Sequence, residues 1–131
     1  MKKLFPSLTL ACCLLCSCKK DNPSTPAELI VGRWTVTSAT HELFTNGTVS
    51  SSSEEHYGAG AYAEFKSNGS FQSQTSGAQY NQQYQLKGDT LIFDNTNTAR
   101  IKILTANNLT YFFRDSINPA QYRVNTFYLV K

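Results

Sequence analysis

Residues 61–130 alternate between short segments of β-forming residues and clusters of turn residues. Within the segments Val, Ile, Leu, Thr, Tyr and Phe recur at every second position, as in strands with one buried face. The turn clusters follow at the spacing of an all-β sandwich or barrel. An α-helical domain is the alternative, but no long stretch repeats its apolar residues at the helical period.

Eight strands are expected from this pattern. The first opens at Gly32-Arg33-Trp34, and the others span 61–65, 71–75, 80–86, 90–94, 100–104, 109–114 and 122–130. Short turns join neighbouring segments, and Asn68-Gly69 carries the strongest hairpin signal. The sequence therefore predicts an all-β, antiparallel up-and-down meander, which removes its exposed edges by closing into a barrel.

Alternate loops of such a meander lie at opposite ends of the barrel. The turns at 68–69, 88–89 and 107–108 then share one tight end, and the loops 45–60, 76–79, 95–98 and 116–121 share an open end. Residues 45–60, with four consecutive serines at 50–53, form the longest expected loop. The Thr25-Pro26-Ala27-Glu28 segment has a capping residue, a Pro at the first helical position and a capping-box Glu. It predicts a short helical turn that could plug the tight end.

The first 17 residues have the parts of an export signal. Lys2 and Lys3 precede an apolar run that is too short to span a bilayer as a helix. Leu15-Cys16-Ser17-Cys18 resembles a bacterial lipobox, and the Lys19-Lys20-Asp21 that follows looks like the start of many Bacteroidetes lipoproteins. An ordinary cleaved signal is the alternative.

The lipobox resemblance implies a signal peptide at 1–17, a lipidated Cys18 with a flexible tether to residue 28, and a barrel domain at 29–131. It also implies a palmitate-type anchor in a bacterial cell envelope, in the outer membrane with a periplasmic or surface face. Several acyl chains together anchor a protein stably.

Charge and cysteine content limit which partners the protein can have and how its exported domain can be stabilised. The net charge of +3 falls to +1 without Lys2 and Lys3, which does not indicate a nucleic-acid partner. All four cysteines lie at or before Cys18, so the exported domain must be stabilised by packing rather than by disulfides.

The short helix, the Gly32-Arg33-Trp34 entry, the long first loop and seven further strands resemble a lipocalin. The segments 65–71 and 88–91 are similar to lipocalin-like domains of bacterial lipoproteins. The resemblance implies that Gly32 and Trp34 form a structural barrel plug, and that a cation near the end of the last strand packs over Trp34. This chain has Lys131 where lipocalins have Arg.

The resemblance also implies a small apolar or amphipathic ligand inside the barrel. Seven aromatic residues could line its site: Phe65, Phe71, Tyr80, Tyr84, Phe93, Tyr111 and Phe113. The alternative is that these side chains fill the barrel, since eight strands leave little more room than side chains need. The protein would then be an envelope interaction protein that contacts a protein or glycan through its first loop.

Other candidate chemistry is weaker. Arg100, Arg114 and Arg123 could form a basic rim at the open end, or could be three separately solvated arginines. His41-Glu42 and Glu54-Glu55-His56 flank the first loop, but their spacing matches no metal site. Ser50–Ser53 beside His56 lack a nucleophile elbow and a third triad member. The sequence therefore predicts no enzyme activity, no metal and no other cofactor.

Overall fold

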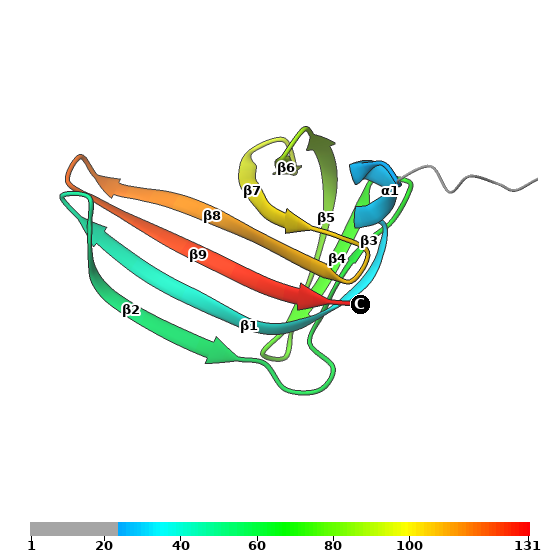
Figure 1. Cartoon of the computed structure of the whole chain (residues 1–131), viewed down its shortest axis with the longest axis horizontal. Helices are drawn as coiled ribbons and strands as arrows, with labels where there is room; N and C mark the ends of the chain where they lie inside the picture. Colours follow the sequence, from blue (N-terminus) through cyan, green and yellow to red (C-terminus); the bar gives the residue numbers. More distant parts are fainter. Residues whose placement is uncertain (1–23) are drawn as a thin grey trace, which may run out of the picture.

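Nine strands and one short helix make up the described part of the chain, residues 24–131 of the computed structural model (Figure 1). The expected signal peptide, the lipidated Cys18 and the tether up to residue 23 lie outside the described residues. The elements are α1 (Pro26–Ile30), β1 (Gly32–Thr45), β2 (Thr48–His56), β3 (Tyr62–Phe65), β4 (Ser70–Thr75), β5 (Ala78–Lys87), β6 (Thr90–Phe93), β7 (Asn97–Leu104), β8 (Asn108–Asn118) and β9 (Gln121–Val130).

Eight of these strands form a closed antiparallel barrel. From β3 to β9 each strand pairs with the next, and β1 pairs with both β3 and β9. The predicted eight-stranded meander is therefore confirmed. The barrel strands, the helix and the core cluster of the described residues all lie within residues 26–131.

Helix α1 begins as its sequence predicts. The Thr25 hydroxyl accepts a hydrogen bond from the Glu28 amide at 3.3 Å, and the Glu28 carboxylate accepts one from the Thr25 amide at 2.8 Å. This capping box satisfies amides that have no partner within the helix. The helix starts inside the range 18–28 assigned to the tether, and its Ile30 is fully buried. None of the helices in residues 24–131 is long and apolar enough to cross a membrane.

The expected long loop at 45–60 was wrong, because most of it is strand β2. This strand pairs with β1 from Ser38 to Thr45, and none of the other strands in the described part of the chain pairs with its second edge. Asn46 and Gly47 make the turn, with φ of 51° and 80°. Asn-Gly suits a two-residue hairpin turn that needs positive φ at both positions. The sequence pattern did not predict β2, because this strand is exposed along its whole length and lacks alternating apolar residues.

A bulge at Thr37 lets β1 change neighbours. The register of β1 against β9 skips this residue. Before the bulge, β1 pairs with β3 up to Thr35, and after it β1 pairs with β2 from Ser38. Bulges bend a strand and increase its twist. The bulge thus divides β1 into a barrel segment and a segment that continues beyond it.

Beyond the bulge, β2, β1, β9 and β8 project from the barrel as a four-stranded sheet (Figure 1). Strand β8 continues to Asn118, whereas its pairing with β7 ends at Phe113. The other expected open-end loops are also shorter than predicted, with Ser76-Gly77 and Pro119-Ala120 as two-residue links. The open end is therefore defined by this projecting sheet and not by long loops.

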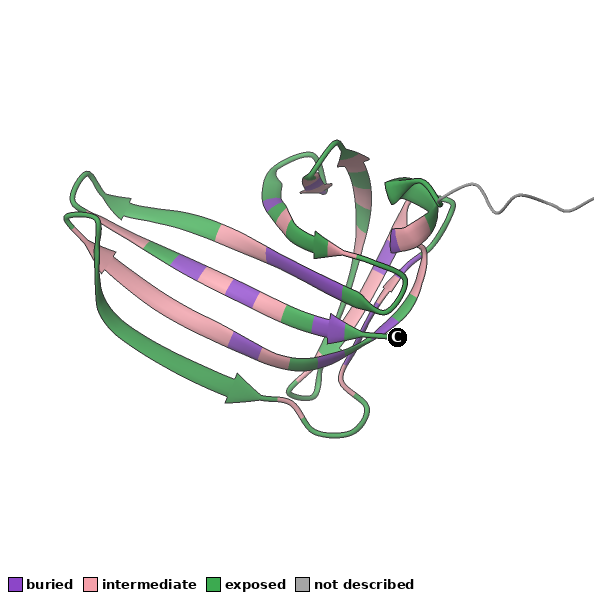
Figure 2. Ribbon diagram, in the orientation of Figure 1, coloured by how far each residue is buried: buried purple, intermediate pink, exposed green. Residues whose placement is uncertain are grey.

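Buried residues gather in the barrel half of the strands, and the projecting sheet is mostly exposed or half-buried (Figure 2). The core cluster consists of Ile30, Trp34, Val36, Ala63, Phe65, Phe71, Leu91, Phe93, Ala99, Leu109, Tyr111 and Leu129.

Candidate functional site

A cavity of about 440 Å³ opens where the projecting sheet leaves the barrel. Its apolar wall consists of three phenylalanines and its rim of polar side chains from both sides of the mouth. The lining residues are Phe93, Phe113, Phe127, His41, Gln82, Asn97, Asp115 and Asn125. The cavity is therefore apolar inside, and the side chains at its mouth can form hydrogen bonds.

A second cavity of about 190 Å³ lies next to the first, towards the core. The two share Gln82, Phe93, Phe113 and Phe127. The remaining lining of the inner cavity is Val36, Ala63, Phe71, Ser73, Thr75, Tyr80 and Tyr111. The barrel is therefore packed at the end that carries α1 and hollow at the other.

Aromatic rings line this hollow from five strands, β4, β5, β6, β8 and β9. Phe93 stands between Phe71 and Phe113, with ring centroids 4.8 and 5.8 Å away. Phe127 lies 5.5 Å from Tyr111 and 6.2 Å from Phe113, the latter edge to face. Such pairs add stability beyond the area that they bury. Burial also raises the pKa of Tyr111, which keeps its hydroxyl neutral inside the barrel.

A chain of hydrogen bonds crosses the mouth on the inner face of the projecting sheet. Asn125 donates from Nδ2 to Asp115 Oδ2 at 3.2 Å, and His41 Nδ1 lies 2.8 Å from Asn125 Oδ1. A carboxylate accepts but does not donate, so the amide NH₂ faces Asp115 and the amide oxygen faces His41. His41 Nδ1 therefore carries a hydrogen.

The chain continues from His41 to a smaller pocket beside β2. His41 Nε2 lies 3.5 Å from Glu55 Oε2, and Glu55 accepts hydrogen bonds from Tyr57 at 3.0 Å and from Ser76 at 3.2 Å. The bond from Tyr57 is the main cause that lowers the pKa of Glu55. Burial, with Glu55 second, raises the pKa of Tyr57 to about 12. These contacts tie β2 to the β4–β5 turn, which its backbone pairing does not reach.

The structure brings together five of the seven aromatic residues that the sequence suggested. Phe71, Tyr80, Phe93, Tyr111 and Phe113 line the inner cavity, although Tyr80 is 56% exposed. The other two belong to the packed part of the barrel. There Phe65 meets Tyr84 edge to face at 5.1 Å, and the Tyr84 hydroxyl donates to the Lys66 carbonyl at 3.0 Å.

Sequence reasoning missed Phe127 and the polar rim. Phe127 alternates with Leu129 along β9, and this signal could have placed it on the inner face. His41 was considered only as a metal ligand, in the pair His41-Glu42 beside Glu54-Glu55-His56, but neighbouring strand residues such as His41 and Glu42 point to opposite faces. The inward partners of His41 are Asn125 on β9 and Ser53 on β2. No group of three or more His, Cys, Asp or Glu within residues 24–131 could hold a metal ion.

Trp34 lies at the packed end, fully buried, with its indole N–H donating to the Ile30 carbonyl at 2.8 Å. Lys131 Nζ sits 4.3 Å from the Trp34 ring centre. Gly32 has a φ of 125°. The Lys131 side chain passes so close to it that a Cβ added to Gly32 would lie 3.3 Å from Lys131 Cε. Helix α1, Trp34 and Lys131 together close this end of the barrel.

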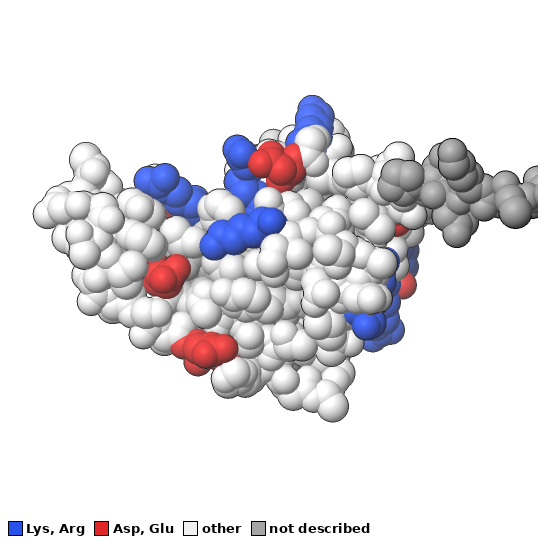
Figure 3. All heavy atoms as spheres, in the orientation of Figure 1, with Lys and Arg blue, Asp and Glu red and all other residues white. Residues whose placement is uncertain are grey.

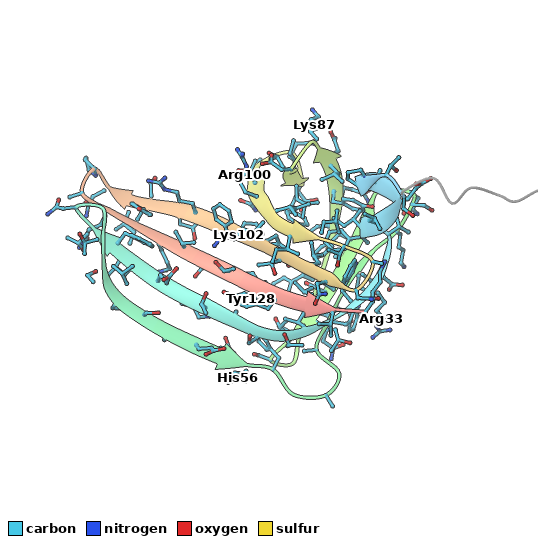
Figure 4. The ribbon with its side chains drawn as sticks, in the orientation of Figure 1. Arg33, His56, Lys87, Arg100, Lys102 and Tyr128 are labelled. Carbon is cyan, nitrogen blue, oxygen red and sulfur yellow. The ribbon has the colours of Figure 1, made fainter. Side chains whose placement is uncertain are left out.

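The three arginines do not form a rim. Arg100 pairs with Asp89 at 2.7 Å beside the β5–β6 turn, near Lys87 in Figure 4. Arg114 stacks on the Tyr122 ring at 3.8 Å on the outer face of the projecting sheet, whereas Arg123 is on the inner face. On the face drawn in Figure 3, basic side chains lie over several elements and are interspersed with acidic ones.

The described part of the chain is thus an all-β protein with a closed eight-stranded barrel, an aromatic interior and an extra strand. No protein-family model matches the chain, and no match was found among curated proteins or solved structures.

Proposed function

We propose that the barrel binds a small apolar or amphipathic molecule in its hollow end, without catalysing a reaction. The observation that carries this proposal is the pair of adjoining cavities with aromatic walls and a polar edge. Binding sites for small molecules are concave, mostly apolar and about 300–1,000 Å³ in size, with a few placed polar groups. The larger cavity alone, at about 440 Å³, falls within that range.

We further propose that the barrel is lipocalin-like. Support comes from the closed eight-stranded meander, the N-terminal helix and the cation held over a buried tryptophan. In this reading Lys131 takes the place of the lipocalin arginine. Gly32 permits the close passage of its side chain.

The lipobox resemblance supports a place for this barrel in a bacterial cell envelope. Cys18 would carry the lipid and hold the protein to the membrane, the outer membrane in the proposed setting. Seven residues lie between Cys18 and Pro26, the first residue of α1, and the eight peptide units that join them reach at most about 25–30 Å when extended. The tether therefore attaches the domain at its packed end.

Two substitutions on one strand test the ligand proposal. Phe113→Trp enlarges a ring that lines both cavities, and Phe112→Trp enlarges its neighbour, which faces outward under Lys102. The probe is a fluorescent fatty-acid analogue, added to residues 19–131 purified without lipid. We expect Phe113→Trp to weaken binding at least about tenfold. The larger ring fills the cavity and removes most of the apolar area that the ligand would bury there, and each Å² of buried apolar area contributes about 25 cal/mol. Phe112→Trp should bind like the wild type, and equal binding by both variants would argue against the cavity.

A second candidate function is contact with an envelope protein or glycan through β2. Within residues 24–131 this strand pairs only with β1 and its other edge has no partner strand, and such an edge can accept a strand from a partner protein. A charged Ser52→Lys change on this edge should then abolish crosslinking to the partner in intact cells, while Phe113→Trp leaves it unchanged. The reverse result supports the ligand proposal.

A further inference from the structure

Among the described residues, Asp115 supplies the one Asp or Glu side chain that lines the larger cavity, and the cavity has no lysine or arginine in its lining. Asp115 Oδ2 accepts the hydrogen bond from Asn125, and within residues 24–131 its Oδ1 has no hydrogen-bond partner. The other polar lining groups are two amides besides Asn125 and the imidazole of His41. The rim thus offers a carboxylate oxygen with a free lone pair to whatever enters.

Aromatic rings stand next to this carboxylate. Phe113 is two residues before Asp115 and on the same face of β8, and it meets Phe127 edge to face at an interplanar angle of 89°. Both rings, with Phe93, line the same cavity as Asp115. The face of an aromatic ring attracts a cation, and aromatic walls beside a carboxylate suit an ammonium group.

The basic residues near Asp115 do not make the cavity better suited to an anion than to an ammonium group. Arg123 lies opposite Asp115 in the strand register, but it neither forms an ion pair with Asp115 nor lines the cavity. Arg114 stacks on Tyr122 on the outer face. The Nδ1 hydrogen of His41 is directed to Asn125. A carboxylate at the mouth would therefore face the Asp115 carboxyl group, and the lining that the described residues form offers it amide donors from Gln82 and Asn97 but no lysine or arginine.

We propose that the ligand is a cationic amphiphile, an amine whose apolar body occupies the aromatic cavity and whose ammonium group binds Asp115. This inference rests on the proposed ligand-binding function and specifies its chemistry. Asp115 determines specificity by attracting the charged end. The aromatic walls bind the apolar body of any such molecule.

Three ligands of equal chain length test it at pH 7: dodecylamine and dodecanoate below their micelle concentrations, and dodecanol below its solubility limit. Their affinities are measured by displacement of a fluorescent probe from residues 19–131. We expect dodecylamine to bind about three- to tenfold more tightly than dodecanol, because its ammonium group forms an exposed ion pair with Asp115 and a cation–π contact with the aromatic wall. Dodecanoate should bind most weakly of the three. The advantage of the amine should fall as salt concentration rises.

Matched variants separate the charge from the fold. Asp115→Asn keeps an acceptor for Asn125 but removes the charge, so it should erase the amine's advantage and leave dodecanol binding unchanged. Glu42→Gln removes a charge from the outer face of the same sheet and should change neither affinity. Thermal unfolding of each variant verifies that the barrel is intact.

The outcomes distinguish this inference from the function on which it rests. Equal binding of dodecylamine and dodecanol, or an advantage that persists in Asp115→Asn, would overturn the inference and leave the ligand proposal standing. Tightest binding by dodecanoate, lost in Arg123→Gln, would also overturn it. Binding of none of the three would contradict the proposed function itself.

Discussion

Lys131 holds its ammonium group 4.3 Å from the centre of the Trp34 ring while donating hydrogen bonds to the carbonyls of Leu29 and Val31, each at 2.9 Å. These contacts join the end of β9, the start of β1 and the end of α1. Burial lowers the pKa of Lys131, because its ammonium group is partly removed from water. The group is stabilised in this position by its hydrogen bonds to carbonyls that the short helix leaves without partners. The packed end of the barrel is therefore a single cluster of three segments.

Replacing Lys131 with Met should destabilise the barrel. The variant keeps an apolar stem but loses two charge-assisted hydrogen bonds and the contact with the ring. The partly exposed position limits the expected loss to about 1–2 kcal/mol of unfolding free energy. Urea denaturation at pH 7 measures it. Lys131→Arg, which keeps charge and donors, should recover most of the loss, and equal stability of Met and wild type would refute the cluster.

Gly32 should resist substitution by alanine. Its φ of 125° is a conformation that residues with a Cβ rarely adopt, and an added Cβ would stand 3.3 Å from Lys131 Cε. Backbone strain of this kind costs about 1–3 kcal/mol. Gly58→Ala, where φ is ordinary and no atom lies within 4 Å of the added Cβ, is the matched control and should be nearly neutral. Similar melting temperatures for the two variants would contradict the prediction.

Tyr57 should make stability depend on alkaline pH. Burial and Glu55 raise its pKa from 10.0 to about 12, so the folded state holds the phenol proton more tightly than the unfolded chain. This contribution is complete below pH 10 and is lost as pH rises through about 12. The difference in unfolding free energy between wild type and Tyr57→Phe should therefore shrink between pH 9.5 and about 11.5. A constant difference would contradict the raised pKa.

Cys18→Ala should abolish the incorporation of labelled fatty acid in cells and release the protein from the membrane. The reason is that a lipobox directs the lipid to its final cysteine. Cys16→Ala, two residues earlier, leaves that cysteine in place and should remain labelled. Unchanged labelling of Cys18→Ala would refute the lipoprotein assignment.

The local sequence determined much of the architecture. The Thr25–Glu28 capping box predicted α1 and the apolar alternation predicted eight strands. Strand β2 was missed because Ser and Thr on two exposed faces leave no periodic signal, and only Asn46-Gly47 marked its hairpin. The polar strand end at 116–118 was read as loop for the same reason.

The candidate site was less accessible to sequence reasoning. Alternation identified inward aromatic residues such as Phe93 and Phe113, but it could not tell the packed half of the barrel from the hollow half. The chain from Asp115 through Asn125 to His41 depends on the register of three strands. That register shifts at the bulge at Thr37, which no residue pattern announces.

The most direct test of the central claim is native mass spectrometry of residues 19–131, purified without lipid, beside a denatured extract of the same sample. We predict a complex in which one small amphipathic molecule is bound per chain, either copurified or formed on addition of dodecyl amphiphiles. Phe113→Trp should remove the bound species. A clean mass of the chain alone, with no thermal shift from any amphiphile, would contradict the claim and favour a barrel that acts through β2.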